Sequence, residues 1–265
     1  MKKKIIIIGG GIAGLSAGVF GQKYNFETEI FEMHKVPGGQ CTAWKRKGYI
    51  FDYCIQWLMG SSKGDVNKLW KELGALSEET PIIEPEIFMK NVNEKGEEFL
   101  LYRDMEKWED YLKKIAPEDE KAISRMFKII NKFSFSGEVE ELMKPKQFRK
   151  TLPMLKLLFK MRSVFIPMIK YGKKSFSSFI SDMGFKNKFL NSFLDKIYGG
   201  EDFSAIAILM MLSLLKDKNA GYPAGGSLNF IHRIADKYRE LGGKLSTGEK
   251  VKEILIKDGR ATGVK

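Results

Sequence analysis

The first fourteen residues of this 265-residue chain form the pattern of a buried strand that leads into a glycine-rich turn and then a helix. Ile5–Ile8 is a β-branched apolar run, and Gly9, Gly11 and Gly14 follow it at the G-x-G-x-x-G spacing. In this pattern the first glycine allows the tight turn, the second lets the backbone approach a pyrophosphate, and the third lets the helix pack close to the strand. The pattern predicts a dinucleotide site, and a purely structural turn is the alternative.

An acidic residue follows at the distance that such a site requires. A helix is expected from Ile12 to about Tyr24, and the positive end of its dipole would face the phosphates. Thr28–Phe31 then reads as the second strand of a βαβ unit, with Glu32 at its carboxyl end. A carboxylate there can accept hydrogen bonds from the adenosine ribose and would repel a 2′-phosphate, which disfavours NADP. The alternative for Glu32 is a solvated charge at the end of a strand.

Composition excludes several classes of protein. No run of eighteen apolar residues occurs, so no membrane-spanning helix is expected, and the apolar stretch after the first lysines is too short for a signal peptide. Cys41 and Cys54 are the only cysteines, and their spacing suits neither a C-x-x-C redox pair nor a zinc site. Both are therefore expected to be reduced thiols in a cytoplasmic protein without a metal. A flavin-linked disulfide reductase is disfavoured for the same reason.

The net charge of +12 is concentrated in one segment. From Leu142 to Ser181 there is no acidic residue, whereas lysines and arginines alternate with leucine, phenylalanine and isoleucine. Lys156, Lys160 and Ser163 fall at helical spacing, so a basic amphipathic helix is expected that could contact an anionic membrane surface. An ordinary helix with a solvated basic face is the alternative. No nucleic-acid-binding motif accompanies the charge, so nucleic acid is not predicted as a partner.

The chain divides into two domains by its patterns. Residues 1–75 and 220–265 carry strand and glycine-turn signals and are expected to form one discontinuous nucleotide-binding domain. Residues 76–219 are expected to form an inserted substrate lobe that is mainly helical after a strand-rich start at 84–102. Its Met and Phe residues could line an adaptable apolar pocket or simply fill a core.

The last part returns to the pattern of the first domain. A turn at 222–226 precedes a helix that ends near Leu241, and Ser227 is the predicted N-cap. Strands are expected from Lys244 and over Val251–Ile256, and Asp258-Gly259 is a hairpin turn. The predicted fold class is therefore α/β, a Rossmann-like domain with an inserted, mainly helical lobe.

Three stretches together resemble the phytoene desaturase-like branch of FAD-dependent oxidoreductases, a group that also contains carotenoid isomerases and retinol saturases. They are Ile5–Gly18 followed by Glu32; Pro37-Gly38-Gly39-Gln40-Cys41 through Gly48–Asp52; and Tyr222–Gly226 with its helix, Val251–Ile254 and Asp258–Gly263. The resemblance implies an FAD in an extended pose. The residues that it implies for cofactor binding are Gly9, Gly11, Ile12, Ala13, Gly14, Glu32, Met33, Gly38, Gly39, Gln40 and Val251.

Two residues and the length depart from the family pattern. The family often has arginine at the position of Gln40 and glycine at that of Cys54. Family members usually continue beyond this point with a segment that closes over the flavin ring. The sequence is therefore expected to be the N-terminal portion of such a protein, with the C-terminal part of the FAD-binding domain missing.

The resemblance implies hydride transfer between FAD and a hydrophobic, polyene or isoprenoid-like substrate. The cofactor does the chemistry in such enzymes, so no side chain is named as a catalytic base. His34 and His232 are expected to be structural. The alternatives are an amine oxidase-like flavoprotein and a non-catalytic, truncated flavin-binding fragment.

Overall fold

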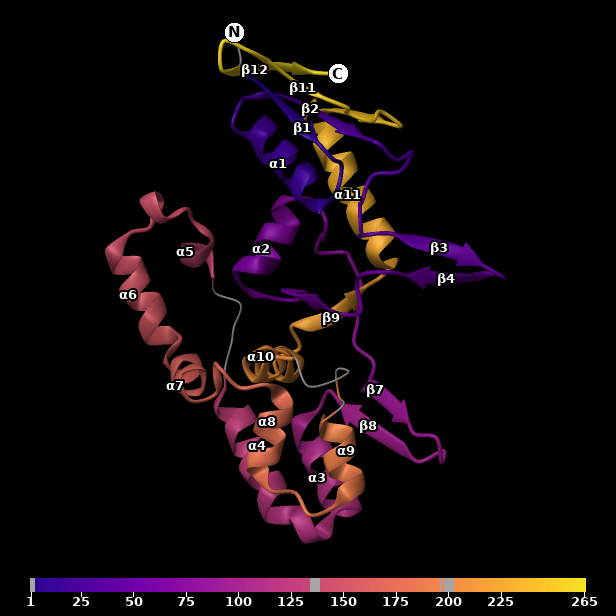
Figure 1. The fold of residues 1–265 in the computed structure, drawn as a ribbon, viewed down its shortest axis with the longest axis vertical. Coiled ribbons are helices and arrows are strands. Elements are labelled where there is room, and N and C mark those ends of the chain that lie inside the picture. The colour runs from indigo at the N-terminus through magenta and orange to yellow at the C-terminus, as the bar shows by residue number, and fades with distance from the viewer. Residues whose placement is uncertain (1–2, 134–138, 196, 198–202) are drawn as a thin grey trace. The chain divides into compact units, whose positions relative to one another are not determined.

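The computed structural model describes residues 3–133, 139–195, 197 and 203–265. They form two compact units (Figure 1). Unit 1 comprises residues 1–58, 67–83 and 222–265, and unit 2 comprises residues 59–66 and 84–221.

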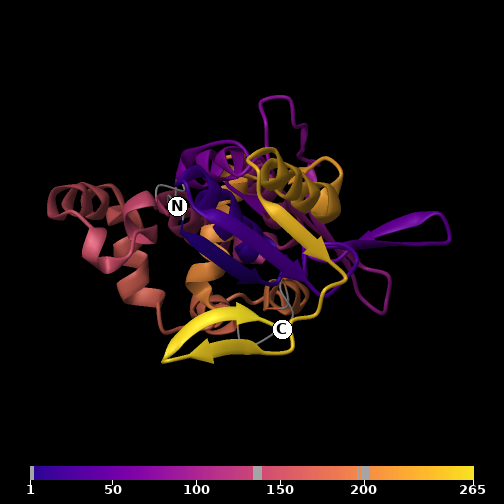
Figure 2. The same ribbon diagram turned by 90° about the horizontal axis from the view of Figure 1, so that it is seen from above.

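A parallel three-stranded sheet organises unit 1. Strand β2 (Glu27–Glu32) lies between β1 (Lys4–Ile8) and β10 (Lys244–Thr247), and the register places Ile6 and Lys244 on either side of Glu29. Helices α1 (Ile12–Lys23) and α11 (Gly226–Glu240) pack on each other, on β2 and on β10 (Figure 2). This β1–α1–β2 unit with a further crossover to β10 is a Rossmann-like arrangement, so the predicted α/β class is confirmed.

The core of unit 1 lies between this sheet and its two helices. Apolar residues at helical spacing point inward from both helices, because each helix must bury one face. The fully buried members include Leu15, Val19, Ile30, Phe230, Ile231 and Ile234. Helix α1 comes very near the sheet: a Cβ at Gly18 would lie 2.8 Å from Ile30 Cδ1.

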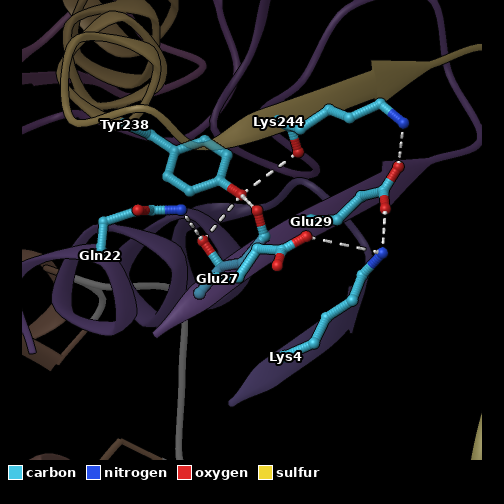
Figure 3. A network of polar contacts seen from close by, with 7 residues as sticks. Lys4, Gln22, Glu27, Glu29, Tyr238 and Lys244 are labelled. Carbon is cyan, nitrogen blue, oxygen red and sulfur yellow. Dashed lines mark hydrogen bonds and ion pairs between the residues drawn. The ribbon is translucent and has the colours of Figure 1, made fainter. Parts of the chain in front are cut away.

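A polar network ties the central strand β2 to both helices and to the two neighbouring strands (Figure 3). The Tyr238 hydroxyl on α11 donates to the Thr28 carbonyl at 2.9 Å, and Thr28 Oγ1 donates to that hydroxyl at 3.0 Å. Beside it, Glu29 forms ion pairs with Lys244 and with Lys4, the latter at 3.1 Å. Tyr238 is fully buried, so the pairing of its hydroxyl avoids the cost of an unsatisfied polar group.

Two hairpins extend unit 1. One consists of β3 (Ala43–Arg46) and β4 (Tyr49–Asp52), and the other of β11 (Ile254–Lys257) and β12 (Arg260–Val264). The predicted Asp258-Gly259 turn is confirmed, with φ of +51° and +72°. The strand expected over Val251–Ile256 begins only at Ile254. The short strands β5 (Leu58–Met59) and β9 (Ala220–Pro223) each contain residues of both units, whereas β6 (Ile82–Ile83) belongs to unit 1. Helix α2 (Gly64–Glu72) precedes the turn at Gly74.

One prediction about helix α11 is wrong. Ser227 is not its N-cap: the helix begins at Gly226, and Gly225 is the N-cap, with φ of +88°. A Cβ at Gly226 would lie 2.1 Å from Asp52 Oδ2, so the backbone comes close to this carboxylate where the helix begins, two residues before the start that Ser227 as N-cap would give.

Unit 2 is a hairpin followed by helices, as the patterns predict. The hairpin is β7 (Ile87–Val92) with β8 (Glu98–Tyr102). The helices are α3 (Met105–Ile115), α4 (Glu120–Lys132), α5 (Glu140–Met143), α6 (Thr151–Lys160), α7 (Arg162–Tyr171), α8 (Phe176–Met183), α9 (Lys188–Asp195) and α10 (Ala205–Lys216), with short 3₁₀ turns at Pro117–Asp119 and Lys146–Phe148. Its Met and Phe residues fill the core: Met126, Phe127, Phe133 and Phe179 are fully buried.

Candidate cofactor site

The turn between β1 and α1 has the geometry that the glycine spacing predicts. Gly9 has φ of +99°, and its N–H donates to the Phe31 carbonyl at 2.8 Å. A Cβ at Gly14 would lie 2.0 Å from the Gly9 carbonyl oxygen, so only glycine fits where the helix leaves the turn. At Gly11 the nearest atoms to such a Cβ lie 4.0 Å away. The third glycine therefore serves packing, and the second leaves open space beside the backbone.

The first turn of α1 presents amide groups to this open space. The Leu15 N–H makes the first hydrogen bond of the helix, donating to the Gly11 carbonyl at 2.9 Å. The preceding amides belong to the helix N-terminus, where N–H groups have no partner within the helix and carry the positive end of the dipole. Ile12 and Ala13 are exposed there. The arrangement suits a phosphate group.

A second glycine turn lies directly against the first. Gly38 N–H donates to the Gly10 carbonyl at 2.9 Å, and Gly11 pairs with Gly38 in an isolated parallel bridge. Gly38 and Gly39 have φ of +140° and +59°. Gly38 is buried, whereas Gly39 and Gln40 are exposed. Two segments that are distant in sequence thus form one glycine-lined cradle, which we define as Gly9–Gly14 with Gly38–Gln40.

Glu32 lies at the carboxyl end of β2 beside this cradle. Its Oε2 accepts the Gly10 N–H at 2.6 Å, and its Oε1 accepts the His34 N–H at 2.8 Å. The side chain is buried, but a carboxylate has about four acceptor positions, so both oxygens keep capacity for ribose hydroxyls. Met33, the next predicted contact residue, is exposed.

Val251, the last residue predicted to contact the cofactor, lies at the same end of the sheet as Glu32, although it is distant in sequence. After β10, Gly248 N–H donates to the His34 carbonyl and Glu249 N–H to the Glu32 carbonyl, both at 2.9 Å. Val251 follows two residues later and is partly exposed. The segment that precedes Val251 therefore lies beside Glu32, which is the arrangement expected if both contact the adenosine of one cofactor.

The residues present fit an extended dinucleotide such as FAD. A side chain at Gly38 would disrupt the second glycine turn, because a Cβ there would lie 2.6 Å from the Cys41 carbonyl oxygen, whereas the backbone at Gly11 is open. Gly10 is a residue that the sequence reasoning missed: a Cβ there would lie 3.0 Å from Glu32 Cβ. The run of three glycines was the available signal, since the second is not part of the G-x-G-x-x-G pattern.

A further group missed at the sequence level surrounds Asp52, at the end of β4. Its carboxylate accepts the Ser227 N–H at 2.6 Å, the Ser227 hydroxyl, the Tyr222 hydroxyl at 2.9 Å and the Cys54 N–H at 3.2 Å. Ser227 also accepts the Cys41 thiol at its carbonyl, at 3.4 Å. The group therefore ties the second glycine turn to the start of α11.

The charges of this group follow from its contacts. Burial acts to raise the pKa of Asp52, but the hydrogen bonds from Ser227, Tyr222 and Cys54 outweigh it and hold the pKa below the ordinary value. Burial, with the nearby carboxylate, raises the pKa of Tyr222 to about 12. Burial also raises the pKa of Cys41 to about 11. Cys41 and Cys54 are free, and Cys41 is an unreactive thiol at neutral pH.

Comparison with known proteins agrees with this geometry. Residues 7–73 match the family model described as an NAD(P)-binding Rossmann-like domain. Among curated proteins, the chain is 24% identical over 264 residues to "Inactive all-trans-retinol 13,14-reductase" of Danio rerio, covering 96% of this chain and 42% of that protein. It is 23% identical over 269 residues to "Phytoene desaturase (lycopene-forming)" of Pseudescherichia vulneris, covering 99% and 52%.

Solved structures share the fold. An oxidoreductase from Methanosarcina mazei aligns with a TM-score of 0.58 at 18% identity, over 98% of this chain and 55% of that chain. Putrescine oxidase aligns with a TM-score of 0.51 at 17% identity, over 96% and 52%. The chain thus spans about half the length of the proteins it matches, and the predicted resemblance is confirmed.

Proposed function

We propose that this relative of the phytoene desaturase-like proteins binds FAD and acts as an FAD-dependent oxidoreductase on a hydrophobic, polyene or isoprenoid-like substrate. The observation that supports this most is the glycine-lined cradle with Glu32 and the Val251 segment beside it. Curated relatives that align over nearly the whole chain are named for oxidoreductase reactions, although one of them is named as inactive. We assign cofactor binding to residues 1–75 and 220–265, and the substrate lobe to residues 76–219.

The chain's own residues would bind and orient the cofactor. The amides of the first turn of α1 and of Gly39 and Gln40 would hold the pyrophosphate, and Glu32 would accept the ribose hydroxyls. Met33 and Val251 would flank the adenosine. Gln40 would contribute no positive charge, so the helix dipole carries the electrostatic attraction for phosphate. When bound, FAD would supply hydride transfer to or from a carbon–carbon bond.

The experiment that tests this function is anaerobic reduction of the purified, FAD-loaded protein. The flavin absorbance is followed with and without a lipid-dispersed polyene, in the presence of a donor or an acceptor. We expect the polyene to change the redox state of the flavin. A bound flavin whose absorbance never responds to any donor or acceptor contradicts enzymatic activity and leaves a non-catalytic flavin-binding fragment.

A second candidate is an amine oxidase-like flavoprotein. The shared fold with putrescine oxidase is what favours it. The same reduction experiment separates the two candidates: reduction by a primary or secondary amine, with no response to the polyene, supports amine oxidation.

We further propose that the protein is cytoplasmic and contacts a membrane surface through residues 142–181. The substrate class would partition into lipid, and the segment carries cations without any acidic residue. In the part of the chain that the structure describes, each helix is too short or too polar to cross a bilayer. Contact would therefore be peripheral.

A further inference from the structure

Helices α6 and α7 bury one side and expose an apolar side. Leu157, Val164, Pro167 and Tyr171 are buried, and α7 packs on α10 while α6 packs on α5 and α7 (Figure 1). The outward side of a surface helix is normally polar. Here it carries large apolar side chains that are 40–87% exposed: Leu152, Leu155, Leu158, Phe159, Ile166, Met168 and Ile169. We call these seven residues the α6–α7 face.

The face has helical periodicity on both helices. Leu152, Leu155 and Phe159 follow the i, i+3, i+7 spacing on α6, and Ile166 and Ile169 are three residues apart on α7. Side chains at these spacings lie on the same side of a helix. On each helix the exposed residues therefore form a stripe rather than single scattered residues, and stripes of this kind mark interaction surfaces.

Cations flank the stripe. Lys156 on α6 and Lys170 on α7 are exposed, and the Arg162 guanidinium lies 4.6 Å from the centre of the Phe159 ring. The Lys160 side chain lies outside the described residues. Because residues 142–181 contain no carboxylate, nothing in the segment neutralises these cations locally. The solvated basic helix considered from the sequence does not account for the exposed apolar stripe.

We propose that the α6–α7 face inserts its apolar side chains into an anionic lipid surface while the flanking cations bind lipid phosphates. This combination of outward Leu, Ile and Phe with flanking Lys and Arg is typical of helices that lie in the membrane interface. Nucleic acid would favour a polar basic surface without an apolar stripe. The inference rests on the proposed membrane contact and not on FAD binding, so the two can fail separately.

The test is flotation of the full chain with vesicles of phosphatidylcholine alone or with about 30% phosphatidylglycerol, at about 0.1 M and about 1 M salt. We expect the wild type to bind the anionic vesicles at low salt, and a fraction of the binding to persist at high salt because apolar insertion is not screened. Absence of binding to the anionic vesicles would overturn the proposal.

Two triple variants separate the components. Lys156→Gln with Arg162→Gln and Lys170→Gln should weaken binding to anionic vesicles by about a hundredfold at low salt. Leu155→Ser with Phe159→Ser and Ile169→Ser should abolish the fraction that resists salt. All six residues are exposed, so circular dichroism should show an unchanged fold. Binding that is unchanged in either variant contradicts the proposed face.

Matched controls come from the exposed β11–β12 hairpin of unit 1 and the residues just before it. Lys250→Gln with Lys252→Gln and Lys257→Gln removes the same charge, and Ile254→Ser with Ile256→Ser removes exposed apolar side chains. These controls should change vesicle binding by less than about threefold, which is less than the effect expected from removing one cation that contacts the lipid surface. An equal loss in the controls would show binding by overall charge and would overturn the proposal.

Two further readouts exclude other occupants. Sedimentation should give the same oligomeric state for the wild type and the apolar variant, because a dimer that the variant dissociates would assign the face to a second copy of the chain. Gly11→Val should lose bound FAD without losing vesicle binding. Loss of both together would contradict a lipid face that is independent of the cofactor site.

Discussion

Glu32 Oε2 lies 2.6 Å from the Gly10 amide nitrogen, so the carboxylate at the end of β2 contacts the middle of the glycine turn that follows β1. With the His34 amide on its other oxygen at 2.8 Å, Glu32 is fixed by two charge-assisted hydrogen bonds. The same side chain thus holds the turn and, in the site we propose, would also accept the ribose hydroxyls. Glu32 is buried and hydrogen-bonded, so it is not the solvated strand-end charge considered as the alternative.

Replacing Glu32 by glutamine should weaken FAD binding by about tenfold. The amide cannot accept from both Gly10 and His34 in the same way, and the negative partner of the ribose hydroxyls is lost. Quenching of flavin fluorescence during titration measures the affinity. Glu27→Gln on the same strand is the control, because its side chain is 62% exposed and should leave the affinity unchanged. Equal affinities of Glu32→Gln and wild type would remove Glu32 from the site.

Replacing Gly14 by alanine should mainly lower stability, whereas replacing Gly11 by alanine should mainly weaken FAD binding. The Gly14 Cβ would collide with the Gly9 carbonyl oxygen, so Gly14→Ala should lower the free energy of unfolding by about 2 kcal/mol. Gly11→Ala meets no atom closer than 4.0 Å, so it should change stability by less than about 1 kcal/mol but weaken FAD binding at least about tenfold. Urea unfolding and FAD titration on both variants check this. A stable Gly14→Ala protein would contradict the close helix–strand approach.

Asp52→Asn should destabilise the protein by about 2 kcal/mol, because the carboxylate accepts hydrogen bonds from Ser227 and Tyr222 that an amide reproduces only in part. Loss of its charge should also lower the pKa of Tyr222 from about 12. Spectrophotometric titration, with Tyr222→Phe to identify the signal, measures this. Asp258→Asn in the exposed hairpin turn is the matched control. A Tyr222 pKa that does not move would contradict the direct contact.

The ion pairs of Glu29 should make stability depend on acid pH (Figure 3). Lys244, with Lys4, holds the pKa of Glu29 below its ordinary value of 4.5, against the effect of burial. A carboxyl with a lowered pKa in the folded state stabilises the protein above its unfolded pKa, and this stabilisation is lost as pH falls through the folded value. Unfolding should cost about 1 kcal/mol more in the wild type than in Glu29→Gln at pH 7, given the partly exposed lysines.

Urea unfolding from about pH 7 to about pH 3 measures that difference, which should shrink below about pH 4.5. Glu94→Gln in an exposed turn serves as the control and should show no such trend. A difference between wild type and Glu29→Gln that stays constant with pH would show that the ion pairs do not stabilise the sheet.

The elements of this fold that depend on neighbouring residues could be predicted from the sequence. The run Ile5–Ile8 with the spaced glycines predicts β1, its turn and α1, because backbone geometry there depends on neighbouring residues. The same holds for the Asp258-Gly259 turn. Contacts across long sequence separations could not be predicted: nothing local indicates that Asp52 accepts hydrogen bonds from Ser227, which lies in the first turn of α11 and is not its N-cap.

The exposed α6–α7 stripe shows the same limit. The spacing of Lys156 and its neighbours indicates amphipathic character, but which side is buried depends on the packing of α7 on α10. The sequence predicted a basic face, and the structure places Phe159 and Ile169 outward together with the cations. Only tertiary packing distinguishes these arrangements.

The most direct test of the cofactor site is titration of the purified wild-type chain with FAD, followed by flavin fluorescence with NAD as competitor. Our account predicts saturation at one FAD per chain, no displacement by an equal concentration of NAD, and loss of binding in Gly11→Val. The absence of saturable FAD binding by the wild type, or a Gly11→Val protein that binds FAD as tightly as the wild type, would contradict it.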